Sequence, residues 1–190
     1  MMMTIIAALV LVWARAAHKP WRELGFVKPA NWISTVVESV ILGAVFKVGM
    51  KAVVMPLLGA DPVNQTYHYL AGNAAALPGT ILLLIVGAGF SEELFFRSFL
   101  FDRLGKLFGD KVWAKPAIVV LTAALFASAH YVDQGVAGVE QAAVTGLVFG
   151  TFYANTGRIV PVMIAHLSFD LAALAMIYYD VEPTIAHLIF

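Results

Sequence analysis

The chain has 190 residues, of which 61% are hydrophobic and only 13% are charged, and its mean hydropathy is +0.86. A soluble domain carries roughly 25% charged residues, so this composition predicts an integral membrane protein. The formal net charge is +0 without any basic run, which argues against a nucleic-acid partner, and the absence of cysteine excludes disulfides, thiolate catalysis and cysteine-ligated metal.

The N-terminal apolar segment resembles a signal peptide in its length and in the small residues that follow it. No basic residue precedes it, whereas four follow it: Arg15, Lys19, Arg22 and Lys28. A cleaved signal peptide has the opposite charge bias, so we interpret the segment as a short first membrane span.

Five further apolar stretches are long enough for helical spans, at about 20 residues per crossing. They cover residues 32–58, 77–101, 112–131, 136–154 and 159–179. The predicted fold is therefore all-α, a polytopic transmembrane bundle of about six spans. We expect one integrated membrane domain, in which residues 1–77 form the N-terminal spans and a basic loop, and residues 78–180 form a core on the last four spans.

The loop charges alternate along the chain and predict an orientation. The 15–28, 102–115 and 155–158 connections are basic, whereas the 59–77 and 132–140 connections and the tail carry only acidic formal charges. Lysine and arginine concentrate in cytoplasmic loops, so we predict that both termini lie outside the cytoplasm.

Ionisable residues inside the apolar stretches are the strongest functional signal. Glu92 and Glu93 are adjacent, and Arg97 follows one helical turn after Glu93. Charges at bilayer depth are costly and usually face a protein interior where they have a function. Glu93 and Arg97 share a helix face and can neutralise each other as an ion pair. Glu92 is then left without a local partner, which favours a role as general acid and base.

Two later stretches add His130, and then His166 and Asp170, which also share a helix face. Alone, each has an ordinary interpretation: an interfacial histidine, or a His–Asp hydrogen bond between helices. Together with Glu92 they form a constellation suited to activating water. On straight helices, His130 would lie about 10 Å nearer the outer face than the other groups, so a kink, tilted helices or a later start of its span is required. The remaining histidines, which we assign to the surface or interface, are His18, His68 and His187.

The three motifs, in order, resemble those of the CPBP family of intramembrane proteases, the type II CAAX prenyl endopeptidases and bacteriocin-processing (Abi) enzymes. That family's signature is EExxxR, FxxxH and HxxxN or HxxxD on successive helices. Here the motifs are EELFFR at 92–97, FASAH at 126–130 and HLSFD at 166–170, and the resemblance covers about residues 78–175.

The resemblance implies hydrolysis of peptide bonds within the membrane. By it, Glu92 with His130 activates the attacking water, and His166 with Asp170 stabilises the tetrahedral oxyanion. Glu93 and Arg97 would support the site, with Phe126 as part of the second motif. The substrate would be a membrane-associated peptide or protein, either prenylated and CAAX-like or a leader peptide, cleaved by a protein of the prokaryotic plasma membrane.

A cofactor-free mechanism is our favoured interpretation. Zn²⁺ is the alternative, held by Glu92, His130, His166 and Asp170, because three protein ligands and a water are usual at a catalytic zinc. The compact HExxH zinc signature is absent. Two other functions compete with the protease: a catalytically silent immunity or scaffold protein of the same family, and a transporter or proton relay. Retention of every motif residue weighs against the first, and the lack of an inverted repeat weighs against the second.

Overall fold

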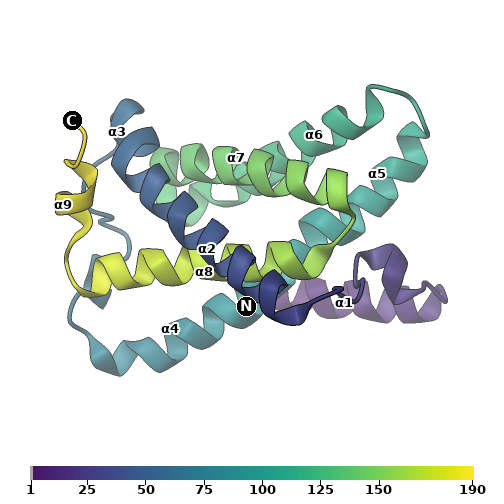
Figure 1. Ribbon diagram of the computed structural model, residues 1–190, viewed down its shortest axis with the longest axis horizontal. Helices are drawn as coiled ribbons and strands as arrows, with labels where there is room; N and C mark the ends of the chain where they lie inside the picture. Colours follow the sequence, from purple (N-terminus) through teal and green to yellow (C-terminus); the bar gives the residue numbers. More distant parts are fainter. Residues whose placement is uncertain (1) are drawn as a thin grey trace.

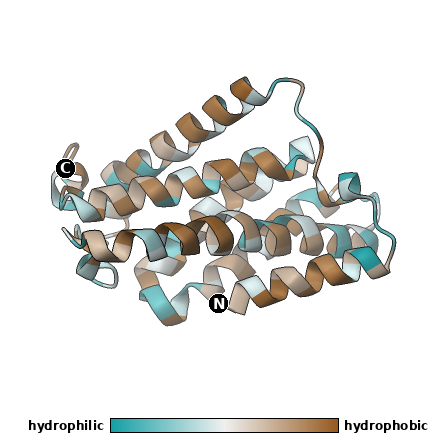
Figure 2. Ribbon diagram, turned by 90° about the horizontal axis from the view of Figure 1, so that it is seen from below, coloured by the Kyte–Doolittle hydropathy of each residue, from teal (hydrophilic) through white to brown (hydrophobic). Residues whose placement is uncertain are grey.

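A computed structural model describes residues 2–190, and within them every regular element is a helix. This confirms the predicted all-α class. Four helical segments are long and apolar enough to cross a membrane, and two further apolar helices are shorter. The long segments are Trp32–Leu57, Ala74–Phe108, Tyr131–Thr156 and Ile159–Tyr178, and the shorter ones are Met2–Ala16 and Ala114–Ala129. The protein is an integral membrane protein, and apolar residues cover long stretches of its helices (Figure 2).

The N-terminal half contains α1 (Met2–Ala16), a 3₁₀ turn η1 (Trp21–Leu24), and one long helix. The long helix begins as α2 (Trp32–Gly49) and continues through a π-helical turn, η2 (Met50–Val54), into α3 (Met55–Leu57). Asn31 fixes the start of α2, because its side-chain oxygen accepts hydrogen bonds from the backbone N–H groups of Ile33 and Ser34. The following connection contains two short 3₁₀ turns, η3 (His68–Leu70) and η4 (Ala74–Ala76).

The next helix carries the glutamate motif and is irregular where that motif lies. It runs from α4 (Leu77–Leu83) through two π-helical segments, η5 (Leu84–Glu92) and η6 (Leu94–Phe99), into α5 (Leu100–Phe108). A π-helical turn is wider than an α-turn, changes the direction of the side chains that follow and is frequent at functional sites. The predicted span at 77–101 is correct in its start, but the helix continues seven residues beyond it because amphipathic α5 follows without a break.

The C-terminal half holds α6 (Ala114–Ala129), α7 (Tyr131–Thr156), α8 (Ile159–Tyr178) and a short α9 (Glu182–Ala186). The sequence predicted a break around residues 133–135, and the backbone leaves the helical conformation at Gly135, with φ 62° and ψ −156°. The helix nevertheless begins earlier, at Tyr131, so that His130 alone separates α6 from α7. Sequence analysis did not predict α9.

Two close helix pairs organise the bundle, α2 with α8 and α6 with α7 (Figure 1). Gly43 permits the first crossing, since a Cβ built on it would lie 2.0 Å from the backbone oxygen of Ala165. Aromatic rings fill the interior beside this crossing: Phe46 packs against both Phe149 and Phe169, with ring centroids 5.8 and 5.4 Å away. The core therefore lies where α2, α7 and α8 meet the glutamate helix.

Candidate active site

The predicted site residues lie on three helices that the fold brings together. Glu92 and Glu93 lie at the junction of η5 and η6, His130 caps the end of α6, and His166 and Asp170 lie on α8. Gly89 allows η5 to approach α8, because a Cβ there would lie 3.1 Å from Cβ of Leu167. Small residues allow helix backbones to come this close within a membrane.

Glu93 is the centre of the polar contacts. Its side chain is fully buried, and its Oε1 atom accepts a hydrogen bond from Nη1 of Arg97 at 2.9 Å. This confirms the ion pair that the spacing predicted. The same oxygen lies 2.6 Å from Nδ1 of His166, on another helix and 73 residues away. The contact between Glu93 and His166 was not predicted, since sequence analysis paired His166 only with Asp170.

The two ring nitrogens of His166 face different carboxylates. A carboxylate only accepts hydrogen bonds, so Nδ1 of His166 carries a proton and donates it to Glu93. The other ring nitrogen, Nε2, faces Oδ2 of Asp170 at 3.6 Å, beyond direct hydrogen-bond distance. A proton on Nε2 as well would make this nitrogen a donor to a further acceptor.

Phe126 joins the second motif to the rest of the site. Its ring lies 4.5 Å from the guanidinium carbon of Arg97 and packs edge-on against the rings of His130 and His166, with centroids 4.6 and 5.8 Å away. Nδ1 of His130 lies 2.8 Å from the backbone oxygen of Phe126. His130 thus meets the rest of the site through the ring of Phe126, which also contacts His166.

Glu92 differs from its neighbour in having no bonded partner. Within residues 2–190, no hydrogen bond or ion pair involves Glu92, and the expected pairing with His130 is not made directly. Three buried polar atoms nearby also lack a partner among the described residues: Oε2 of Glu93, Nη2 of Arg97 and Oγ of Ser98. Unsatisfied buried groups of this kind are expected where water or substrate binds.

The same side chains were tested as a zinc site. Three protein ligands would have to converge on one point at about 2.0–2.2 Å from the ion. Among residues 2–190, no three His, Asp or Glu side chains are arranged in this way. The four candidate ligands are therefore not arranged for zinc in this conformation. The chemistry below is therefore derived from the side chains of the chain itself.

Sequence analysis missed two buried lysines on the long N-terminal helix. Lys47 donates a hydrogen bond to Oε1 of Gln141 at 2.7 Å, and Lys51 forms an ion pair with Glu182 at 2.8 Å. Both lysines are less than 10% exposed. The criterion that identified Glu92, an ionisable residue inside an apolar stretch, would also have found them.

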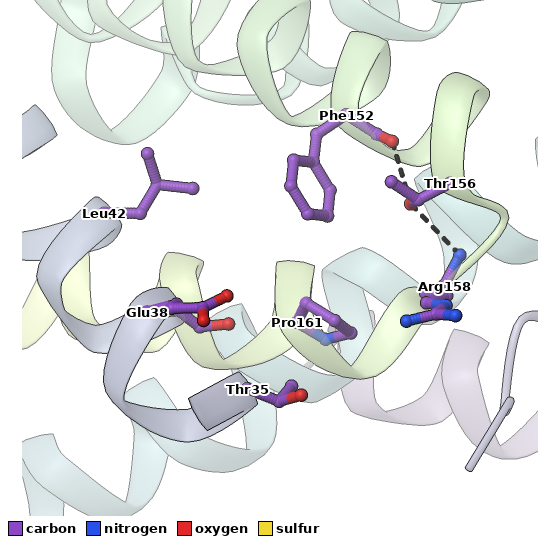
Figure 3. A pocket seen from close by; sticks show the side chains of 8 residues that line it. Thr35, Glu38, Leu42, Phe152, Thr156, Arg158 and Pro161 are labelled. Carbon is purple, nitrogen blue, oxygen red and sulfur yellow. Dashed lines mark hydrogen bonds between the residues drawn. The ribbon is translucent and has the colours of Figure 1, made fainter. Parts of the chain in front are cut away.

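A cavity of about 340 Å³ lies at the end of the bundle where α7 connects to α8 (Figure 3). Glu38 and Leu42 of α2 form one side, Phe152 of α7 the other, and Pro161 of α8 lies between them. None of the predicted site residues lines it. An adjoining apolar hollow continues along α2 to Phe46. The ring of Phe46 packs on Phe149, which in turn packs on His166. These two rings therefore lie between the site and the groove formed by the cavity and the hollow (the α2–α7 groove).

Comparison with known proteins identifies the class of this membrane protein. A family model described as type II CAAX prenyl endopeptidase Rce1-like matches residues 74–172, a little over half of the chain. The chain belongs to this family of CAAX-type intramembrane proteases, as the motifs predicted. No curated protein and no solved structure matches the chain.

Proposed function

We propose that this protein is an intramembrane endopeptidase that uses Glu92 to activate water. The observation that carries the proposal is the difference between two adjacent glutamates. Glu93 is fully buried and engaged by Arg97 and His166, whereas Glu92 is partly accessible and has no bonded partner within residues 2–190. A general base must be reached by water. Of the two carboxylates Glu92 is the more accessible, whereas the unpaired Oε2 atom of Glu93 is fully buried.

The proposed reaction begins when Glu92 takes a proton from water as the water oxygen attacks the scissile carbonyl carbon. His130 assists by orienting the water. The tetrahedral oxyanion accepts a hydrogen bond from the free Nε2–H of His166, a type of contact worth roughly 3–4 kcal/mol in the transition state. The C–N bond then breaks, and Glu92 returns its proton to the leaving amine, so that the protons balance.

The remaining polar residues hold this geometry. Glu93 fixes the ring of His166 by accepting from Nδ1, and Arg97 neutralises Glu93. Asp170 lies beyond Nε2 of His166 and stabilises its protonated form. A mechanism that places oriented donors in a dry interior before the substrate arrives needs little reorganisation during the reaction.

We infer that the substrate is a membrane-associated peptide or protein and that it approaches along the α2–α7 groove. The groove has a polar end, with Glu38 and Arg158, and an apolar end near Phe46. A peptide with a hydrophobic side chain or lipid group is the ligand that such a groove accommodates. Whether that group is a prenyl chain, and whether the membrane is a prokaryotic plasma membrane, stay predictions.

The decisive experiment compares the membrane peptidome of cells that express the wild-type protein with that of cells expressing Glu92→Gln. We expect peptides that appear only with the wild type, and the responsible substrate should then be cleaved by purified protein in liposomes. Glu140→Gln, on α7 and outside every contact described above, is the matched control. Equal cleavage by the Glu92→Gln variant would refute the assignment of Glu92. Wild-type protein that cleaves nothing would support a silent scaffold instead.

A further inference from the structure

The connection between α1 and α2 is tightly folded and is held against two other helices. Leu24 of η1 is fully buried, and the backbone oxygen of Gly25 accepts a hydrogen bond at 2.9 Å from the backbone N–H of Ile159, at the start of α8. Nζ of Lys19 lies 2.6 Å from Oδ1 of Asp102 on α5. These contacts bring the three basic connections together at one end of the bundle, on the right in Figure 1.

This end of the bundle holds every lysine and arginine that is not buried. The buried ones are Lys47, Lys51 and Arg97, and all the others lie in the three basic connections. Arg22 and Lys28, between α1 and α2, are exposed, and no ion pair within residues 2–190 includes either of them. Their charges are therefore available to an anion outside the protein.

Exposed tryptophan side chains lie in the same part of the chain. Trp21 immediately precedes Arg22 and is 53% exposed, and Trp32, at the start of α2, is 50% exposed. Tryptophan is enriched at the membrane–water interface, where its amphipathic ring sits among the lipid head groups. An exposed indole next to unpaired cations suits a ligand that has both an apolar part and a negative charge. A phospholipid with an anionic head group has both.

We propose that Trp21, Arg22 and Lys28 (the basic platform) bind the head groups of anionic phospholipids. Lysines and arginines next to a membrane are attracted to an anionic leaflet, and this attraction is screened by salt. The basic platform lies outside the region that matches the protease family, and its binding of lipid does not depend on the proposed function. It is a second site, at the surface of the bundle, for the lipid that surrounds the protein.

Contacts beside the basic platform connect it to the helix that carries the glutamates. Lys19, in the same connection, bonds to Asp102 of α5, and α5 continues directly from η6. Trp13, near the end of α1, packs edge-on against Phe99 of η6, with ring centroids 5.1 Å apart, and the guanidinium carbon of Arg103 lies 4.5 Å from the same indole ring. A ligand that binds only the folded protein stabilises it, so anionic lipid should raise the Tm.

The test compares phosphatidylglycerol with phosphatidylcholine on the purified full chain. Native mass spectrometry measures the lipid that stays bound, and thermal unfolding in nanodiscs of either composition measures Tm. We expect the wild type to retain phosphatidylglycerol preferentially and to unfold at a higher temperature in nanodiscs that contain it. Arg22→Gln combined with Lys28→Gln should lower this preference by about fivefold for each cation removed. Arg22→Lys combined with Lys28→Arg keeps both charges and should keep the preference.

The matched control is Lys106→Gln combined with Lys111→Gln, which removes two cations that already have partners at the same end. Lys106 lies 3.4 Å from Asp102, and Lys111 lies over the ring of Trp113. This variant should keep most of the preference. Three results would overturn the proposal: no preference of the wild type for phosphatidylglycerol, equal losses in the two glutamine double variants, or stronger retention of a soluble polyglutamate peptide than of phosphatidylglycerol. None of these measurements requires cleavage, so they are independent of the proposed function.

Discussion

Glu93 accepts hydrogen bonds through one oxygen from two side chains, that of Arg97 on its own helix at 2.9 Å and that of His166 on α8 at 2.6 Å. It therefore connects the first and third motifs of the family in space. Within one helix, Arg97 compensates the buried charge of Glu93; between helices, Glu93 sets the orientation of the imidazole. The fully buried glutamate thus joins two helices, whereas Glu92 has no bonded partner within residues 2–190.

The first prediction concerns stability. Glu93→Gln and Arg97→Ala should each lower the free energy of unfolding by about 3–5 kcal/mol, because each leaves an uncompensated buried charge. Glu92→Gln should cost much less, since Glu92 has no bonded partner within residues 2–190. Thermal unfolding in detergent measures all three. Equal losses for the adjacent glutamates would contradict the division of roles between them.

A second prediction tests the crossing of α2 and α8. Gly43→Ala should destabilise the protein by about 1–3 kcal/mol or more, because the new methyl group would lie 2.0 Å from the backbone oxygen of Ala165. Gly49→Ala on the same helix is the matched control. No atom lies within 4 Å of a Cβ at Gly49, so this change should be neutral or stabilising, by up to about 1 kcal/mol. Comparable unfolding temperatures for the two variants would refute the close crossing.

The third prediction is the orientation in the membrane. Val112 and Val132 are 95% and 88% exposed, which makes them suitable positions for single cysteines in this cysteine-free chain. Because the 102–115 connection is basic and the 132–140 connection is not, an impermeant thiol reagent on intact cells should label Val132→Cys only. Val112→Cys should react after the cells are permeabilised. The reverse pattern would invert the orientation.

The fourth prediction separates the cofactor-free mechanism from a zinc-dependent one. Asp170→Asn should keep activity within about tenfold of the wild type, because an amide can donate to the oxyanion, whose individual contacts are worth roughly 3–4 kcal/mol. Activity should also survive treatment with a chelator, and elemental analysis should find no stoichiometric divalent ion. If zinc were present at one per chain, lost together with activity and restored with it, the metalloprotease alternative would be correct.

The fifth prediction places the substrate in the α2–α7 groove. Val45 lines the apolar part of the groove, whereas Val48 on the same helix does not. Val45→Trp should raise KM for a hydrophobic peptide, because the indole fills the space that the substrate would occupy. Val48→Trp adds the same bulk elsewhere and should leave KM unchanged. A KM that responds equally to both variants would argue against this path.

Local spacing was enough to predict several features of the protein. Composition and apolar runs predicted an all-α membrane protein, and a separation of four residues predicted the pair of Glu93 with Arg97, since such residues share one helix face. The three ordered motifs predicted the family. Lys47 was within reach of the same reasoning, since it also interrupts an apolar run.

Only the tertiary structure decided which of these groups meet. The contact of Glu93 with His166 joins residues 73 positions apart, and it depends on the close approach of η5 to α8 at Gly89. Lys51 with Glu182 spans 131 positions and depends on the short helix α9. Periodicity reports the face on which a residue lies, but not the helix that this face contacts. Which helices contact each other is determined by the packing of all helices together, and a local sequence pattern carries no information about this packing.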